Sequence, residues 1–304
     1  TVLDLPQDES GWSALIAQVQ ARRIGREACQ MIMECTGVYS EQIAHYLFAQ
    51  GYAVFMEPPG KIKRGFYERG KNDTVDSRQI GEYAFRFADR LHPWQPRDVL
   101  VEQIAACLSM REALSKYRVA YTNRIKALKQ KQHSMTGILT AYATLQTTTE
   151  SEIERVDREV QRLIAQNPTL QMKVDQVLSI SEIGMQIAAQ LLVCTNGFTE
   201  HLDAQEIASF AGICPREHQS GSSIHRPARS DNLGPARLRK LLYLAAMRLR
   251  KNSPEFRAYF ERKVAEGKAP RLVLRNIENK CLKLICGVLK SGKPYISSYR
   301  SIKQ

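Results

Sequence analysis

The apolar positions in the first hundred residues follow two alternating periods. Residues 11–21 carry apolar side chains at helical spacing, while the short apolar run at 30–34 is typical of a buried strand. A helical pattern returns at 38–50, and a second strand is predicted at 52–56. This alternation, with a further helix starting near Asp73, predicts an α/β sheet.

The middle of the chain is dominated by helical periodicity. One long helix is predicted over 99–133, and a second is predicted from a capping sequence at 149–152 to the residue before Asn167. The stretch between them, 139–149, is ambiguous. Two long amphipathic helices of this kind predict an antiparallel arm or a dimerising coiled coil, and a plain helical connector is the alternative.

The remainder of the chain is predicted to be mostly helical. Helices are expected after Gly234 and over 271–290, and the polar stretch 215–233 between helical patterns is expected to be a loop. The chain therefore divides into three predicted domains: an α/β domain at 1–97, a helical arm at 98–172 and a helical domain at 173–304.

Charge is distributed unequally between these parts. The 304 residues carry a net charge of +13. From residue 205 onward there are 21 Lys and Arg against 7 Asp and Glu, or +14, whereas the first 204 residues hold 23 against 24, or −1. A solubilising surface would spread its charge over the whole chain. The segregated excess favours nucleic acid as a partner, bound in a strongly salt-dependent manner.

Cysteine usage and hydropathy narrow the class further. Seven cysteines without a Cys-x-x-Cys pair argue against both a disulfide scaffold and a zinc cluster. No apolar run approaches the ~18 residues that a membrane span needs, and no signal peptide is recognised. We therefore expect a cytoplasmic protein without a membrane partner.

Three acidic residues are candidates for metal binding. Glu34 ends the first predicted strand, and Asp73 and Asp76 lie one helical turn apart at the start of a helix. The carboxyl edge of a sheet is where α/β proteins place ligands, and Mg²⁺ prefers carboxylate oxygens. The alternative is that Asp73 is a helix N-cap and Asp76 a favourable first-turn acid.

Ser220 is the candidate nucleophile, because it stands before a glycine in a basic segment. A serine needs a base or a metal for activation, and Ser-Gly is also a common turn sequence, so an ordinary loop is the alternative. His218 and His225 fit solvated loop histidines better than general bases. The cations expected to grip phosphate are Arg216, Arg226, Arg229, Arg237, Arg239 and Lys240.

Five runs in this order carry a family resemblance. They are 33–39 (MECTGVY), 71–78 (KNDTVDSR), 210–223 (FAGICPREHQSGSS), 238–243 (LRKLLY) and 289–294 (LKSGKP). The chain resembles the DEDD transposases and recombinases of prokaryotic insertion sequences, a group that includes the Piv-type DNA invertases.

The resemblance implies a fold and a mechanism. It implies a RuvC-like (RNase H-type) domain, a coiled-coil insertion and a mostly α-helical transposase domain. Glu34, Asp73 and Asp76 would bind Mg²⁺, and Ser220 would attack DNA phosphate and hold the strand through a phosphoserine link. The implied partners are donor and target DNA, a non-coding bridge RNA and further copies of the chain, as a dimer or tetramer, in association with the nucleoid.

The chain departs from the family pattern in two places. The family's first aspartate lies on an opening strand in a Gly-x-Asp context that nothing here matches, so the N-terminal strands of the fold are expected to be missing. Ser181-Glu182-Ile183-Gly184 also has fewer glycines than the corresponding hairpin of relatives. Two alternatives therefore stay open: a RuvC-type nuclease that uses metal-activated water, and a non-catalytic nucleic-acid-binding protein.

Overall fold

A computed structural model describes residues 3–66, 72–133, 135–200, 203–220, 224–230 and 234–296, with the backbone alone at Val38 and over 215–229. The chain forms two compact units, Thr1–Pro96 and Arg97–Gln304. No helix in the described ranges is long and apolar enough to cross a membrane.

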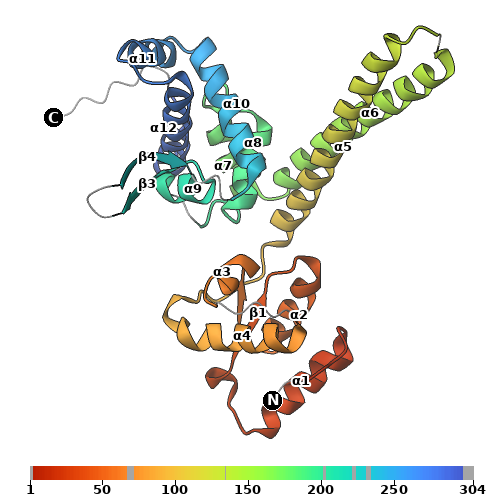
Figure 1. Ribbon diagram of the computed structural model, residues 1–304, viewed down its shortest axis with the longest axis vertical. Coiled ribbons are helices and arrows are strands. Elements are labelled where there is room, and N and C mark those ends of the chain that lie inside the picture. The colour runs from red at the N-terminus through yellow and green to blue at the C-terminus, as the bar shows by residue number, and fades with distance from the viewer. Residues whose placement is uncertain are drawn as a thin grey trace. The chain divides into compact units, whose positions relative to one another are not determined.

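The first unit is built on a two-stranded parallel sheet. Strand β1 (Gln30–Glu34) pairs with β2 (Ala53–Glu57) in a register that runs from Gln30 opposite Ala53 to Glu34 opposite Glu57. Helix α2 connects the two strands, as parallel pairing requires. The helices of this unit are α1 (Glu9–Ala21), α2 (Val38–Ala49), α3 (Pro59–Lys63) and α4 (Asp73–Arg86), with 3₁₀ turns η1 (Arg26–Ala28) and η2 (Ala88–Arg90) (Figure 1).

Alternate residues of each strand face two different apolar clusters. Met31 and Val54 pack with residues of α1 and α2, whereas Ile32 and Phe55 pack with residues of α3 and α4. Successive strand residues point to opposite faces, so helices cover both sides of the sheet. The predicted strand at 30–34 is confirmed, and the one predicted at 52–56 is shifted by one residue.

The predicted α/β organisation of this unit is therefore present, within a chain that is mostly helical. A RuvC-like fold is a finer statement than two described strands support, and it stays a prediction.

Two long antiparallel helices form the arm of the second unit. They are α5 (Val99–Lys129) and α6 (Thr136–Ala165), which lie side by side (Figure 1). Asp98 caps α5 by accepting hydrogen bonds from the N–H groups of Leu100 and Val101.

The start predicted for the second arm helix is wrong. The helix begins at Thr136 and includes the ambiguous stretch, so the residues at 149–152 lie inside it rather than capping it. The Thr149 hydroxyl donates to the carbonyl of Leu145, one turn back, and three threonines before it do the same. These bonds satisfy the hydroxyls within the helix, which is why a threonine-rich stretch with weak propensity can be helical.

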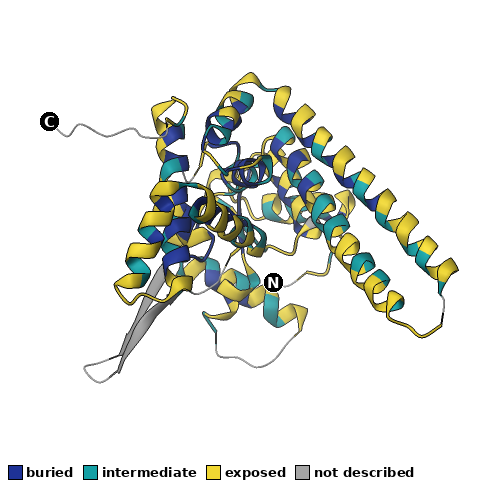
Figure 2. Ribbon diagram, turned by 90° about the horizontal axis from the view of Figure 1, so that it is seen from above, coloured by how far each residue is buried: buried dark blue, intermediate teal, exposed yellow. Residues whose placement is uncertain are grey.

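The rest of the second unit is a helical body with a continuous core. Its helices are α7 (Pro168–Leu178), α8 (Met185–Cys194), α9 (Ala204–Phe210), α10 (Ala236–Asn252), α11 (Pro254–Ala265) and α12 (Pro270–Ser291). Helix α12 buries nine residues, among them Ile277 and Leu282, and the cluster continues into the base of the arm at Ile104 and Val160. Buried positions follow the inner sides of these helices, and their outer sides are exposed (Figure 2).

The stretch expected to be a loop at 215–233 contains an antiparallel hairpin instead. Strand β3 (Pro215–Ser220) pairs with β4 (Ile224–Ser230), with an irregularity between Arg216 and His218. Ile224 is the one large aliphatic residue in the two strands, so the alternation of apolar and polar residues that marks a half-buried strand is missing.

Candidate functional site

Glu34 lies at the carboxyl end of β1, half-buried, opposite Glu57 of β2. The main chain continues the pairing beyond it, since the Cys35 N–H donates to the Glu57 carbonyl at 2.9 Å. Glu34 is thus fixed at the sheet edge where α/β proteins bind ligands.

Asp73 and Asp76 lie in the first turn of α4, which packs against β1. Asp73 is exposed and Asp76 is half-buried. The N-cap of this helix is Asn72, whose side-chain oxygen accepts from the Val75 N–H at 2.7 Å. The alternative in which Asp73 caps the helix is therefore wrong, and its carboxylate is not used by the cap.

The donor chemistry of these acids fits Mg²⁺, but their arrangement does not complete a protein-only site. Among the described residues no group of three or more His, Cys, Asp or Glu side chains is placed to hold one ion. Mg²⁺ is commonly held by one or two carboxylates together with water and substrate phosphates. Glu34 and the α4 acids fit that kind of site.

Glu57 is a carboxylate that the sequence analysis did not single out. Its side chain is 7% exposed and pairs at 2.8 Å with Lys61, the third residue of α3 and four positions on from Glu57. The hydrogen bond from Lys61 to Glu57 raises the pKa of the lysine. This internal partner occupies the carboxylate, so we assign Glu57 to the support of the sheet edge. The four-residue spacing of Glu57 and Lys61 is the sequence feature from which this ion pair could have been predicted.

Ser220 ends strand β3, where its backbone pairs with Ile224. The side chain of Ser220 lies outside the described part of the structure. The same holds for the predicted phosphate-binding residues Arg216, Arg226 and Arg229, for His218 and His225, and for Lys71 of the acid-bearing motif.

The hairpin segment is fixed at its two ends. Arg239 donates from one guanidinium nitrogen to the carbonyl of Ala211, before β3, and to that of Gly234, after β4, each at 3.0 Å. Gly234 has a φ of +99°, and a Cβ there would lie 1.9 Å from the carbonyl oxygen of Phe210. Only glycine fits this approach.

Arg237 is engaged in the packing of its own unit. Its guanidinium donates to the Leu108 carbonyl and, at 3.1 Å, to the side-chain oxygen of Gln186, and lies 3.7 Å from the Glu112 carboxylate. Its side chain is 15% exposed, and burial lowers the pKa of the guanidinium. These contacts tie α10 to the arm, so we assign Arg237 a structural role. Lys240, one turn on, is exposed.

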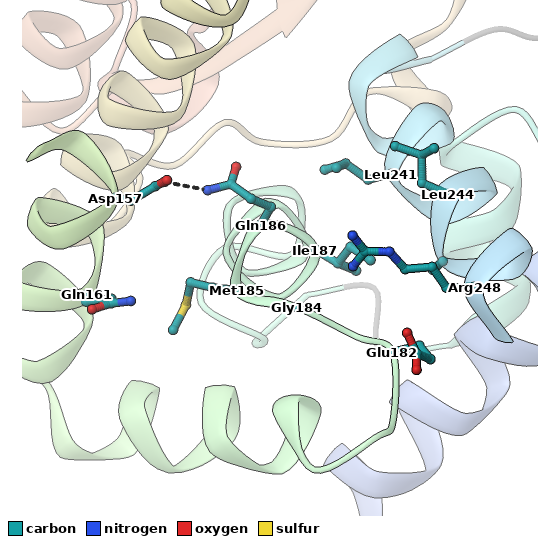
Figure 3. A pocket seen from close by; sticks show the side chains of 11 residues that line it. Asp157, Gln161, Glu182, Gly184, Met185, Gln186, Ile187, Leu241, Leu244 and Arg248 are labelled. Atoms are coloured by element: carbon teal, nitrogen blue, oxygen red, sulfur yellow. Dashed lines mark hydrogen bonds between the residues drawn. The ribbon is translucent and has the colours of Figure 1, made fainter. Parts of the chain in front are cut away.

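The same network continues into the arm through Asp157. Arg111 binds the Asp157 carboxylate through two nitrogens, at 2.6 and 3.0 Å, and Gln186 donates to it at 2.7 Å. Beside this network lies a cavity of about 360 Å³ whose lining includes Asp157, Gln186 and Arg248 (Figure 3). The polar side chains here satisfy one another, which is the usual way that half-buried charges are accommodated.

Comparison with known proteins gives the same family at both ends of the chain. A transposase model of the DEDD IS110 type matches residues 2–132, and the model of the transposase IS116/IS110/IS902 family matches residues 174–261. Pilin gene-inverting proteins of Moraxella bovis and Moraxella lacunata are each 26% identical over 292 residues, covering 95% of this chain and 88% of theirs.

A further relative comes from an insertion element. An uncharacterized 43.6 kDa protein of insertion element IS110 from Streptomyces coelicolor is 29% identical over 119 residues, covering 39% of this chain and 29% of its own length. The family models match segments that contain Glu34, Asp73 and Asp76 on one side and Ser220 on the other. The chain belongs to the IS110 family of transposases and DNA recombinases.

Proposed function

We propose that this member of the family cuts and rejoins donor and target DNA through a serine-linked phosphodiester, with Mg²⁺ held by its acidic residues. The observation that carries the metal part of the proposal is the placement of Glu34 at the carboxyl end of β1, against which the helix bearing Asp73 and Asp76 packs. Oxygen donors at such an edge suit a phosphoryl-transfer site.

Glu34, Asp73 and Asp76 would hold the ion together with oxygens of the DNA. When bound, Mg²⁺ stabilises the negative charge that develops on the phosphate during transfer. The positive end of the α4 helix dipole lies at its N-terminus, so this turn is a favourable place for the negative charge of Asp73 and Asp76.

Ser220 would act as the nucleophile in two balanced steps. In the first, its Oγ forms a bond to the phosphorus of a DNA phosphodiester. The serine proton is lost, and the sugar oxygen of the departing strand leaves and takes up a proton. In the second, a hydroxyl of another strand gives up its proton and forms a bond to the same phosphorus. The bond from phosphorus to the serine Oγ breaks and Oγ takes up a proton, so the DNA is rejoined and the serine restored.

Cations of the second unit would hold the phosphates during these steps. We assign this role to Arg216, Arg226, Arg229, Arg239 and Lys240, and leave out Arg237 because its side chain is 15% exposed and its guanidinium is bound between α5 and α8. The +14 excess from residue 205 onward supports backbone contacts to nucleic acid. The bridge RNA as guide and a dimer or tetramer formed through the arm rest on the resemblance alone.

A RuvC-type nuclease is the second candidate. It is favoured because Glu34, Asp73 and Asp76 lie at a packed sheet edge, whereas Ser220 lies on a hairpin of the other unit. In that case metal-activated water cuts the strand and Ser220 is incidental. A third outcome, binding without cutting, would make the chain a non-catalytic nucleic-acid-binding protein.

The test uses the protein with its cognate RNA, end-labelled donor and target DNA, and Mg²⁺, followed by a denaturing gel. The serine mechanism predicts a protein-linked DNA band that Ser220→Ala removes while DNA binding persists. Ser222→Ala, in the same segment, is the matched control and keeps the band. Free cleaved ends that are unaffected by Ser220→Ala would identify the nuclease, and binding without cleavage would identify the non-catalytic protein.

A further inference from the structure

A basic cavity of about 450 Å³ lies between α10 and α12. Arg239, Lys240 and Tyr243 line it from α10, and Arg271, Arg275 and Glu278 line it from α12. The two helices pack directly against each other, which makes the cavity a feature of the helical body itself. Four cations face one carboxylate, so the cavity keeps a net positive charge.

The one carboxylate of the cavity, Glu278, is buried and holds the guanidinium of Arg275 in place. Glu278 is 1% exposed, and Arg275 donates to it at 2.7 Å with a side chain that is 23% exposed. A guanidinium has five N–H donors, so this bond leaves others to point elsewhere. Glu278 thereby fixes the direction of Arg275 at the wall of the cavity.

A second wall residue connects the cavity to the hairpin that carries Ser220. Arg239 holds the carbonyls of Ala211 and Gly234, the residues that flank the hairpin segment on either side. The cavity therefore lies at the base of the hairpin, where β3 begins at Pro215. Ser220 is at the other end of that strand, five residue steps away, or about 17 Å at ~3.3 Å per step.

This separation excludes the cavity as the place of the phosphate that Ser220 would attack. The charges of one B-DNA strand repeat about every 3.4 Å along the helix axis, and each phosphate is also rotated about that axis relative to the last. The phosphate in the cavity is therefore expected a few nucleotides from the one at Ser220. A guanidinium group suits a phosphate because two of its N–H groups can donate parallel hydrogen bonds to two phosphate oxygens. Tyr243, 39% exposed at the rim, adds an aromatic face for the adjacent sugar or base.

We propose that the cavity of Arg239, Lys240, Arg271 and Arg275 binds a phosphodiester of the DNA strand several nucleotides from the phosphate at Ser220. It acts as an anchor that sets which phosphate reaches the serine. The spacing between the two phosphates rests on the proposed serine mechanism. The binding of a phosphate in the cavity does not, and it can be measured by itself. The alternative is that these cations form part of a diffuse basic surface.

The test measures DNA binding in the Ser220→Ala protein, which removes the proposed nucleophile. Arg271→Ala is the probe variant because Arg271 is exposed, so its removal leaves the core intact. Lys283→Ala is the matched control. Lys283 is an exposed cation on the same helix, but it lines a different cavity, beside Tyr259. Fluorescence anisotropy with a labelled 30-base-pair DNA duplex is recorded over a series of salt concentrations, and with an RNA duplex of the same sequence.

The anchor predicts that Arg271→Ala weakens DNA binding about tenfold and lowers the salt slope by about one, while Lys283→Ala changes affinity less than about twofold. Equal losses from the two variants would overturn the proposal in favour of a diffuse surface. A loss confined to RNA would overturn the assignment to DNA. Either result leaves the covalent-adduct test of Ser220 untouched, so the two proposals fail separately.

Discussion

The α/β unit and the helical unit hold their candidate catalytic residues in different ways. Glu34, Asp73 and Asp76 stand on a strand end and a capped helix turn, backed by two apolar clusters on opposite faces of the sheet. Ser220 stands at the far end of a two-stranded hairpin whose flanking residues are held by Arg239 and by the close approach at Gly234.

The difference matters for how each group of residues is disturbed. The acids depend on packing and on one cap, both of which are local to their elements. The position of Ser220 depends on the geometry at the base of its hairpin. A substitution at that base is therefore expected to displace Ser220 although the substituted residue does not contact it. Substitutions that separate these dependencies test the comparison directly.

Gly234→Ala should have the largest effect. Its Cβ would lie 1.9 Å from a backbone oxygen, at a φ of +99°, so the main chain at the hairpin base must move. We expect a loss of more than about 3 kcal/mol in unfolding free energy, or a folded protein that no longer forms the DNA adduct. Gly267→Ala is the control, since φ there is +84° but nothing lies within 4 Å of the added Cβ. Denaturant unfolding of both variants decides, and equal effects would contradict the role of the close approach.

Glu278→Gln should change the pH dependence of stability. Burial raises the pKa of Glu278 to about 7 from 4.5, against the opposing effect of Arg275. Because the folded state binds this proton more tightly than the unfolded state, the contribution is full below about pH 4.5 and is lost as pH rises through 7.

The shift corresponds to about 3 kcal/mol between those limits. The glutamine variant does not ionise, so its stability should fall less between pH 5 and pH 8 than that of the parent. Urea unfolding across this range measures it, and parallel curves for the two proteins would show that Glu278 does not titrate as stated.

Arg237→Ala and Lys240→Ala should have opposite signatures although they lie one turn apart. The first removes the donor to the Gln186 side chain and the Leu108 carbonyl, whereas Glu112 keeps its ion pair with Lys116, and it is expected to cost about 2 kcal/mol of stability. The second should change stability by less than about 0.5 kcal/mol and weaken DNA binding with a smaller salt slope. Thermal unfolding of both variants measures the change in stability, and fluorescence anisotropy measures the change in DNA binding. Together they distinguish a cation that supports the fold from one that binds DNA.

Asn72→Ala should destabilise the protein less than Arg237→Ala. It removes the bond to the Val75 N–H at the start of α4 and should cost about 1 kcal/mol. Because Asp73 and Asp76 follow directly, we also expect more Mg²⁺ to be needed for half-maximal adduct formation. Asn72→Asp keeps a capping oxygen and should retain the stability, and a raised Mg²⁺ requirement in that variant alone would contradict the capping account.

Hydrophobic periodicity was sufficient to predict the elements that bury an apolar face. The strand at 30–34 and the helix over 271–290, found as Pro270–Ser291, both have one. It could not predict the hairpin, because β3 and β4 contain almost no apolar residues, nor the first half of α6, where threonine hydroxyls bond back along the helix.

The candidate site was predictable in its residue types but not in its internal partners. Acids at a strand end and at a helix start are visible in the printed sequence. That Asn72 rather than Asp73 caps α4 depends on the residue at which the helix begins, which neighbouring polar residues leave open. That Arg237 is held inside the fold depends on contacts between segments far apart in the chain. A basic residue in a sequence has the same appearance whether it faces DNA or a buried carbonyl.

The most direct test of the central claim is to locate the covalent bond. The trapped protein–DNA adduct is digested with nuclease and trypsin. Because trypsin does not cleave before Pro227, the serines of this segment lie in the tryptic peptide 217–229, which is fragmented in a mass spectrometer. The account predicts a nucleotide phosphate on Ser220, with Ser222 and Ser223 unmodified. A nucleotide on another residue, or efficient cleavage with no modified peptide, would contradict it.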